Sequence, residues 1–211
     1  MTSVQHPADV HPDLAELRPG WHFADPGPLG LAAFALTTFV LSFMNTGLFK
    51  AEPVVFGLAL AYGGGVQILA GMWEFAKGNT FGATAFCSYG GFWISFWYLT
   101  GHTNLGGIGG GDLNKSLGIW VVAWAIFTAY MLIASLRTNL ALVAVFGFLT
   151  LTFIFLAIGY FTANVGATTP DAMTKIGGWL GLVTAVVAWY TSFAGVLSST
   201  FRRPVLPTGA R

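Results

Sequence analysis

Charged residues are scarce in this chain. Asp, Glu, Lys and Arg make up only 8% of the 211 residues, too few to solvate the surface of an ordinary water-soluble protein. The uncharged stretches between them are each about 20 residues or longer. These stretches are Pro28–Phe49, Pro53–Trp73, Gly78–Gly111, Ser116–Leu136, Thr138–Pro170 and Ile176–Phe201. Because a charge at the centre of a membrane-spanning helix costs about 2.5–3.5 kcal/mol, the pattern predicts an integral membrane protein.

Cysteines and basic runs are also scarce. The single cysteine, Cys87, excludes an intramolecular disulfide and is expected to be a small apolar packing residue. Without a basic run, the chain gives no indication of binding to nucleic acid. Residues 1–24 are polar and lack the basic start and apolar stretch of a signal peptide, so they are expected to form a polar N-terminal tail.

Apolar residues are abundant, at 55% of the chain, with 16% aromatics and a mean hydropathy of +0.70. The apolar runs are continuous rather than alternating, which favours membrane-spanning helices over barrel strands. The sequence therefore predicts an all-α membrane fold, with a six-helix domain over residues 25–201 and a basic tail over residues 202–211. The predicted helices are 28–47, 53–73, 80–100, 116–135, 139–160 and 176–198.

The basic residues indicate an orientation. Six helices place both termini on one side, which then carries Arg18, Lys77, Arg137, Arg202, Arg203 and Arg211. The other side carries Lys50, Lys115 and Lys175. Because cytoplasmic loops are enriched in Lys and Arg, both termini are expected in the cytoplasm and the protein in the plasma or inner membrane.

Uncharged polar side chains recur inside or beside the predicted helices. Each alone can hydrogen-bond within its own helix, but as a set they are candidates to line a path for a small polar solute. The candidates inside helices are Thr37, Asn45, Gln67, Thr84 and Ser88, and those near helix ends are Asn79, Asn104 and Asn164.

The predicted helices contain no charge that could hold an acid or carry a proton. Without Lys or Arg, a carboxylate would be held by hydroxyls, amides and helix N-termini, and such weak sites suit rapid passage. Without Asp, Glu or His, a proton has no mid-membrane carrier. Glu74, at the end of the second helix, is expected to be solvated or paired with Lys77.

The chain shows no pattern typical of an enzyme. It contains no nucleophile–base pair, metal-ligand cluster or phosphate-binding loop, and its four histidines lie outside the predicted helices. Neither a metal nor a cofactor is expected.

The 28 glycines suggest closely packed helices. Gly78 and Gly82, like Gly177 and Gly181, have the spacing that lets helix backbones approach. The sequence Tyr62-Gly-Gly-Gly65 should weaken the second helix by about 1 kcal/mol per glycine, which close packing or function should offset.

A weaker pattern relates the first, third and fifth predicted helices. Each contains two Phe five residues apart with Thr between them, in Phe34–Phe39, Phe81–Phe86 and Phe148–Phe153. The separations are unequal, so the chain has no fixed repeat. The pattern suggests three related hairpins with these odd-numbered helices innermost.

Several motifs resemble the acetate uptake transporter family, the succinate–acetate permeases. The segment Asp25-Pro-Gly-Pro-Leu-Gly-Leu31 is similar to the family signature Asn-Pro-Ala-Pro-Leu-Gly-Leu. Ala61-Tyr-Gly-Gly-Gly-Val-Gln-Ile-Leu-Ala-Gly-Met-Trp-Glu-Phe75 looks like its second helix, and Lys77-Gly-Asn-Thr-Phe-Gly-Ala-Thr-Ala-Phe86 like the start of its third. The resemblance covers residues 25–207.

The resemblance implies a homohexamer of six-helix protomers, each with its own path for acetate and, in some members, succinate. By motif, Phe34, Tyr89 and Leu149 would form an apolar constriction, and Ala188 would lie beside the path on the sixth helix. The signature residues would be Asp25, Pro26, Pro28, Leu29 and Gly30.

The chain departs from the family signature at Asp25, where Asn is usual, and at Gly27, where Ala is usual. Either Asn or Asp can cap a helix beginning at Pro28, but only Asp adds a negative charge near the cytoplasmic mouth. The departure predicts mild repulsion of approaching anions.

Several functions remain compatible with the residues. An uncharged path suits either a channel or a symporter that carries the acid with a proton. A channel for another small solute such as ammonia, or a sensor or scaffold that transports nothing, is an alternative. The short soluble segments argue against an output domain for a sensor.

Overall fold

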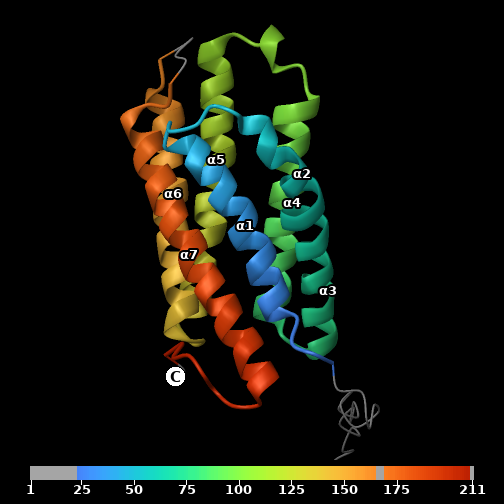
Figure 1. The fold of residues 1–211 in the computed structure, drawn as a ribbon. Helices are drawn as coiled ribbons and strands as arrows, with labels where there is room; N and C mark the ends of the chain where they lie inside the picture. The colour runs from blue at the N-terminus through green and yellow to red at the C-terminus, as the bar shows by residue number, and fades with distance from the viewer. Residues whose placement is uncertain (1–22, 165–168, 210–211) are drawn as a thin grey trace, which may run out of the picture.

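The computed structural model describes residues 23–164 and 169–209, which form a bundle of long helices without strands (Figure 1). Most of the expected N-terminal tail, residues 1–24, lies outside the described residues. The helical elements of the described part are α1 (Gly27–Asn45), η1 (Glu52–Val55), α2 (Phe56–Leu60), η2 (Ala61–Val66), α3 (Gln67–Lys77), α4 (Thr80–His102), η3 (Leu105–Gly107), α5 (Gly110–Ser135), α6 (Leu140–Thr162) and α7 (Ala172–Phe201).

The all-helical prediction is confirmed for the described residues, and each predicted span has a helical counterpart. Five helical segments are long and apolar enough to cross a membrane: Gly27–Asn45, Pro53–Lys77, Gly110–Ser135, Leu140–Thr162 and Ala172–Phe201. The third predicted span, α4, has 23 residues and so the required length. Its Gly, Ser, Thr and Tyr residues make it less apolar than the other five.

The glycine triplet lies in an irregular part of the second span. Residues Ala61–Val66 form a π-helix, which widens the turn between α2 and α3. A Cβ atom at Gly63 would lie 2.5 Å from Thr37 Oγ1 on α1, so this glycine permits a close approach of two helices. Close packing therefore accounts for a glycine that would otherwise weaken the helix.

Gly78 has a different role from the one its spacing predicted. Its φ of +83° places it in the left-handed region, where it ends α3 as the C-cap, and a Cβ there would have no neighbour within 4 Å. Gly82 does allow close packing, because a Cβ there would lie 2.9 Å from Glu74 Cδ. The pair is therefore not a helix-packing motif.

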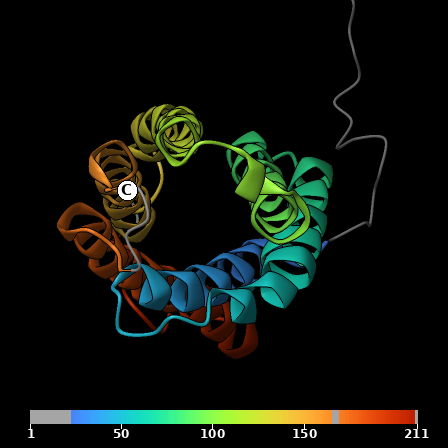
Figure 2. The same ribbon diagram turned by 90° about the horizontal axis from the view of Figure 1, so that it is seen from above.

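The long helices form a ring when viewed along the bundle (Figure 2). Helix α7 packs between α1 and α6, α6 also contacts α5, and α3 packs against α4. Helices α1, α4 and α6 all begin at the same end of the bundle. The C-terminal segment, residues 204–209, folds back beneath that end, where the carbonyl oxygens of Gly209 and Thr208 accept the N–H groups of Leu140 and Ala141 at 3.0 and 3.1 Å.

At the other end of the bundle, Asp171 caps α7. Its Oδ1 accepts the Thr174 N–H at 2.7 Å, and its Oδ2 accepts the Thr162 hydroxyl at 2.7 Å. Partial burial, the largest single influence, raises the pKa of Asp171, but these hydrogen bonds and nearby Lys175 together lower it below its ordinary value of 3.8.

Candidate functional site

Two cavities lie end to end inside the ring. The larger has a volume of about 400 Å3 and the smaller about 40 Å3. Helices α1, α4 and α6 wall both cavities along their lengths. The lining runs from Gly27 through Phe34 to Asn45 on α1, from Asn79 (its N-cap) through Tyr89 to Trp93 on α4, and from Asn139 (its N-cap) through Leu149 to Leu156 on α6. The three helices that share the Phe/Thr pattern are thus the ones that line both cavities, whereas α3 and α7 line only the larger one.

Phe34, Tyr89 and Leu149 line both cavities and so lie at the boundary between them. All three side chains are buried, with exposed fractions of 5%, 3% and 3%. The rings of Phe34 and Tyr89 are tilted at 53° with centroids 5.6 Å apart. The three residues expected from the motifs to form a constriction are therefore brought together from three helices.

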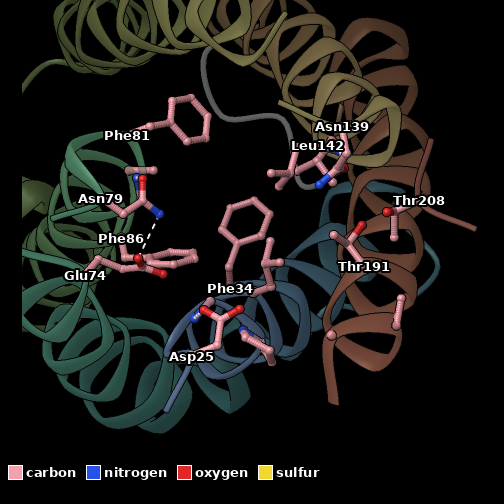
Figure 3. Close-up of a pocket in the computed structure, with 18 of the residues that line it drawn as sticks. Asp25, Phe34, Glu74, Asn79, Phe81, Phe86, Asn139, Leu142, Thr191 and Thr208 are labelled. Carbon is pink, nitrogen blue, oxygen red and sulfur yellow. Dashed lines mark hydrogen bonds between the residues drawn. The ribbon is translucent and has the colours of Figure 1, made fainter. Parts of the chain in front are cut away.

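The larger cavity contains a buried carboxyl group. Glu74 on α3 is 1% exposed, and its Oε2 accepts a hydrogen bond from Asn79 Nδ2 at 2.7 Å (Figure 3). Asn79 Oδ1 accepts the Gly82 N–H at 3.1 Å, so the same side chain caps α4. The prediction of a solvated or Lys77-paired Glu74 is wrong, because the N-terminus of α4 packs over this carboxyl.

Lys77 pairs with Asp25 instead, at 2.8 Å between Nζ and Oδ1. Asp25 Oδ1 also accepts the Gly27 N–H at 3.0 Å. Asp25 does place a negative charge here, but Lys77 lies against it, and mild repulsion of anions by Asp25 stays a prediction. The capping prediction also needs correction: α1 begins at Gly27, and its N-cap is Pro26, which makes no side-chain capping hydrogen bond.

The other signature residues join the start of α1 to its neighbours. The Pro28 carbonyl oxygen accepts the Ser192 hydroxyl of α7 at 2.6 Å. A Cβ at Gly30 would lie 2.7 Å from the Phe86 ring of α4, which leaves room only for glycine. Leu29 points outward and is 46% exposed.

Three residues that line the cavities have buried polar atoms without a hydrogen-bond partner. Among the described residues, they are Gln67 Nε2 and Oε1, Thr38 Oγ1 and Trp93 Nε1. Gln67 is 1% exposed and lines the larger cavity, whereas Thr38 and Trp93 line the smaller one. Because an unpaired buried polar atom costs about 1–3 kcal/mol, these atoms favour a polar occupant of the cavities.

The remaining candidate residues divide between cavity wall and helix packing. Asn45 lines the smaller cavity. Thr37 donates to the Ala33 carbonyl at 2.9 Å and packs against Gly63. Neither cavity is lined by Thr37, Thr84, Ser88, Asn104, Asn164 or Ala188. Ala188 is fully buried in the apolar core.

The C-terminal segment, residues 204–209, also forms part of the wall. Pro204, Leu206 and Thr208 line the larger cavity, and Tyr190 Oη donates to the Pro207 carbonyl at 2.7 Å. Sequence reasoning did not assign these residues to the site, because a short proline-containing tail has no pattern that shows where it folds back.

Comparison with known proteins identifies relatives with transport names. The GPR1/FUN34/yaaH family matches residues 8–208. Acetate permease A of Emericella nidulans is 42% identical over 217 residues, covering 95% of this chain and 73% of the relative. Ammonia transport outward protein 2 of Saccharomyces cerevisiae is 42% identical over 197 residues, and this chain spans only 66% of its length. The succinate-acetate/proton symporter SatP of Escherichia coli is 38% identical over 186 residues, covering 88% of this chain and 95% of the relative.

A solved structure has a similar fold. The structure of the bacterial acetate channel SatP superposes with a TM-score of 0.79 at 36% sequence identity. The alignment covers 89% of this chain and 100% of that chain. The similarity therefore extends over most of this chain and all of the solved one.

Proposed function

Because the chain belongs to the GPR1/FUN34/yaaH family, we propose that it conducts acetate and related small carboxylates across a membrane, with succinate as a further substrate. The apolar helices and the transport names of its relatives support a membrane transporter rather than an enzyme. The acid would pass through the two cavities of each protomer, from the larger to the smaller or in reverse.

One observation carries this proposal: two cavities lie in line, apolar at their boundary and polar on both sides of it. A carboxylate in the larger cavity would find the Gln67 amide, and one in the smaller cavity the Thr38 hydroxyl and the Trp93 N–H. Asn45 lines the smaller cavity as a further amide. Neutral donors hold an anion weakly, which permits release as well as binding.

Phe34, Tyr89 and Leu149 would then act as an apolar constriction. A carboxylate that passes them sheds water without gaining a charged partner, so small acids cross more readily than large or doubly charged ones. Leu149 is the simplest residue at which to test this constriction, because its side chain can be shortened without breaking a hydrogen bond.

The assembly and orientation are part of the proposal. Six spans, including α4, a homohexamer with one path per protomer and cytoplasmic termini follow from the family resemblance and the basic residues. The relatives are named both as a channel and as a proton symporter. The path is compatible with either form of transport.

Flux in proteoliposomes tests the function. Radiolabelled acetate should enter liposomes that contain the protein, and formate, propionate and succinate should compete. Flux with and without an imposed pH gradient then separates conduction from proton-linked transport. Absence of protein-dependent acetate flux under both conditions would refute the proposal.

Leu149→Ala should raise propionate flux relative to acetate, because removal of the isobutyl group widens the boundary. Leu151→Ala is the matched control, since Leu151 lies two residues along the same helix but is 43% exposed. Equal effects of the two substitutions would show that Leu149 does not restrict the path.

Ammonia is the second candidate substrate, favoured by the name of the yeast relative. Ammonium-dependent pH changes inside the same liposomes, without acetate flux, would favour it.

A further inference from the structure

The hydroxyl of Tyr89 is hydrogen-bonded to a helix that lines neither cavity. Tyr89 Oη lies 2.9 Å from Thr128 Oγ1, which is on α5, the one long helix of the described part that lines neither cavity. Thr128 is 0% exposed. The phenol thus reaches across from α4 to a buried hydroxyl behind the cavity wall.

The direction of this hydrogen bond follows from the partners of Thr128. Its Oγ1 donates to the Trp124 carbonyl oxygen at 2.7 Å. A threonine hydroxyl has one hydrogen, so Thr128 can only accept from Tyr89. The Tyr89 hydrogen is therefore committed to Thr128 and is not free to bind an anion.

Four aromatic side chains pack against the ring of Tyr89. Its ring contacts Phe127 at 5.3 Å, Phe34 at 5.6 Å, and Trp124 and Phe146 at 6.2 Å between centroids. Aromatic pairs can adopt either an offset-stacked or an edge-to-face geometry, so these contacts permit more than one orientation of the ring. The hydrogen bond to Thr128 is directional, so it selects one orientation of the ring.

We propose that Thr128 is a positioning residue that holds the Tyr89 hydroxyl behind the cavity wall, so that the passing acid meets the ring of Tyr89 and not its O–H. This inference rests on the proposed function, because it concerns the same constriction. Thr128 then helps to set size selectivity without touching the substrate. Its loss would release the phenol into the path, where it would narrow the boundary and offer a donor to the acid.

A double-mutant cycle tests the proposal. Thr128→Val replaces the hydroxyl by a methyl group of similar size, Thr128→Ser retains the hydroxyl, and Tyr89→Phe removes the partner. The readout is the ratio of acetate to propionate flux in proteoliposomes. Since a buried hydrogen bond contributes on the order of 1 kcal/mol, Thr128→Val should change this ratio about 2- to 10-fold. Thr128→Ser should restore the ratio of the unaltered protein.

The Y89F background gives the decisive comparison. There the proposal expects Thr128→Val to have no further effect, because the hydroxyl that Thr128 positions is absent. An effect of equal size in both backgrounds would show that Thr128 acts through helix packing and would overturn the proposal.

An experimental structure of the T128V protein provides a test independent of flux. The Tyr89 hydroxyl should turn from α5 towards the cavities. If it stays in place, the proposal is wrong. Absence of acetate flux through the unaltered protein would instead refute the proposed function. The structure of the T128V protein would still decide whether Thr128 positions the Tyr89 hydroxyl.

Discussion

Asn79 makes two hydrogen bonds from one side chain, and its replacement should separate their contributions to stability. Its Oδ1 caps α4 through Gly82 N, and its Nδ2 donates to the buried carboxyl of Glu74. Asn139 caps α6 in the same manner, through Leu142 N at 2.9 Å. Each asparagine therefore caps its own helix, and of the two only Asn79 has a carboxyl partner in the described part of the chain.

The expected magnitudes follow from these bonds. Asn139→Ala should lower the free energy of unfolding by about 1 kcal/mol, the usual cost of a lost N-cap. Asn79→Ala should lose the same cap plus a bond to a carboxylate of about 1.5–3 kcal/mol, for a total of about 2.5–4 kcal/mol. Part of this cost arises because Glu74 stays buried without its donor.

The assay is unfolding in mixed micelles by titration with SDS, with helix content as the signal. Glu74→Gln supplies a second comparison, since it removes the charge from the pair. In the E74Q background the Gln amide oxygen can still accept from Asn79, so Asn79→Ala should cost about 1.5–2.5 kcal/mol, the cap plus a neutral hydrogen bond. If Asn79→Ala costs no more than Asn139→Ala in the unaltered protein, the bond to Glu74 adds nothing and the reasoning fails.

Two further predictions concern the two ends of the bundle. Asp171→Ala should lower the free energy of unfolding at neutral pH. Because the folded-state pKa of Asp171 is lowered, this loss of stability is complete above pH 3.8 and fades as the pH falls further. Acid unfolding curves of the two proteins would show it. A difference that persists unchanged at the lowest pH would contradict this. Tyr190→Phe frees the Pro207 carbonyl, so amide hydrogen exchange in residues 204–209 should accelerate; unchanged exchange would show that this bond does not hold the tail.

Much of the fold could be predicted because it depends on local composition. The placement of charges gave helix positions that agree with the structure within a few residues at most ends. The largest difference is the start of α5 at Gly110 rather than 116, because polar Asp112 and Lys115 continue the helix beyond its apolar part. The family assignment is confirmed by the match over residues 8–208.

Contacts between distant segments could not be predicted. Thr128 and Tyr89 are 39 residues apart, and no motif links them. The sequence placed Glu74 at a helix end, where a carboxyl is normally solvated, but its burial depends on how α4 packs over α3. The place of Thr37 could not be predicted either. A polar residue inside a span can line a cavity or pack against a glycine on the neighbouring helix, and the sequence does not distinguish the two.

Under the proposed function, the helix N-termini at one end of the larger cavity would attract an acid to a path that has no mid-span cation. Helices α1, α4 and α6 all begin there, with Gly27, Asn79 and Asn139 in the wall. Each helix N-terminus favours an anion by about 0.3–1 kcal/mol, so three supply about 1–3 kcal/mol. The charge of Lys77 offsets that of Asp25. The carboxyl of Glu74 opposes an approaching anion and already accepts the hydrogen bond that the Asn79 amide could donate to it.

The attraction at this end of the cavity is therefore small, and that is consistent with passage. A lysine fixed at the boundary would hold a carboxylate more strongly than helix ends do and would cost about 2.5–3.5 kcal/mol to place in the membrane. Under the proposed function, helix ends would draw the acid in, and unpaired amide, hydroxyl and indole groups would hold it briefly. The three apolar side chains would separate one weak site from the next. Weak sites in series allow release at the far side, which a single strong site would prevent.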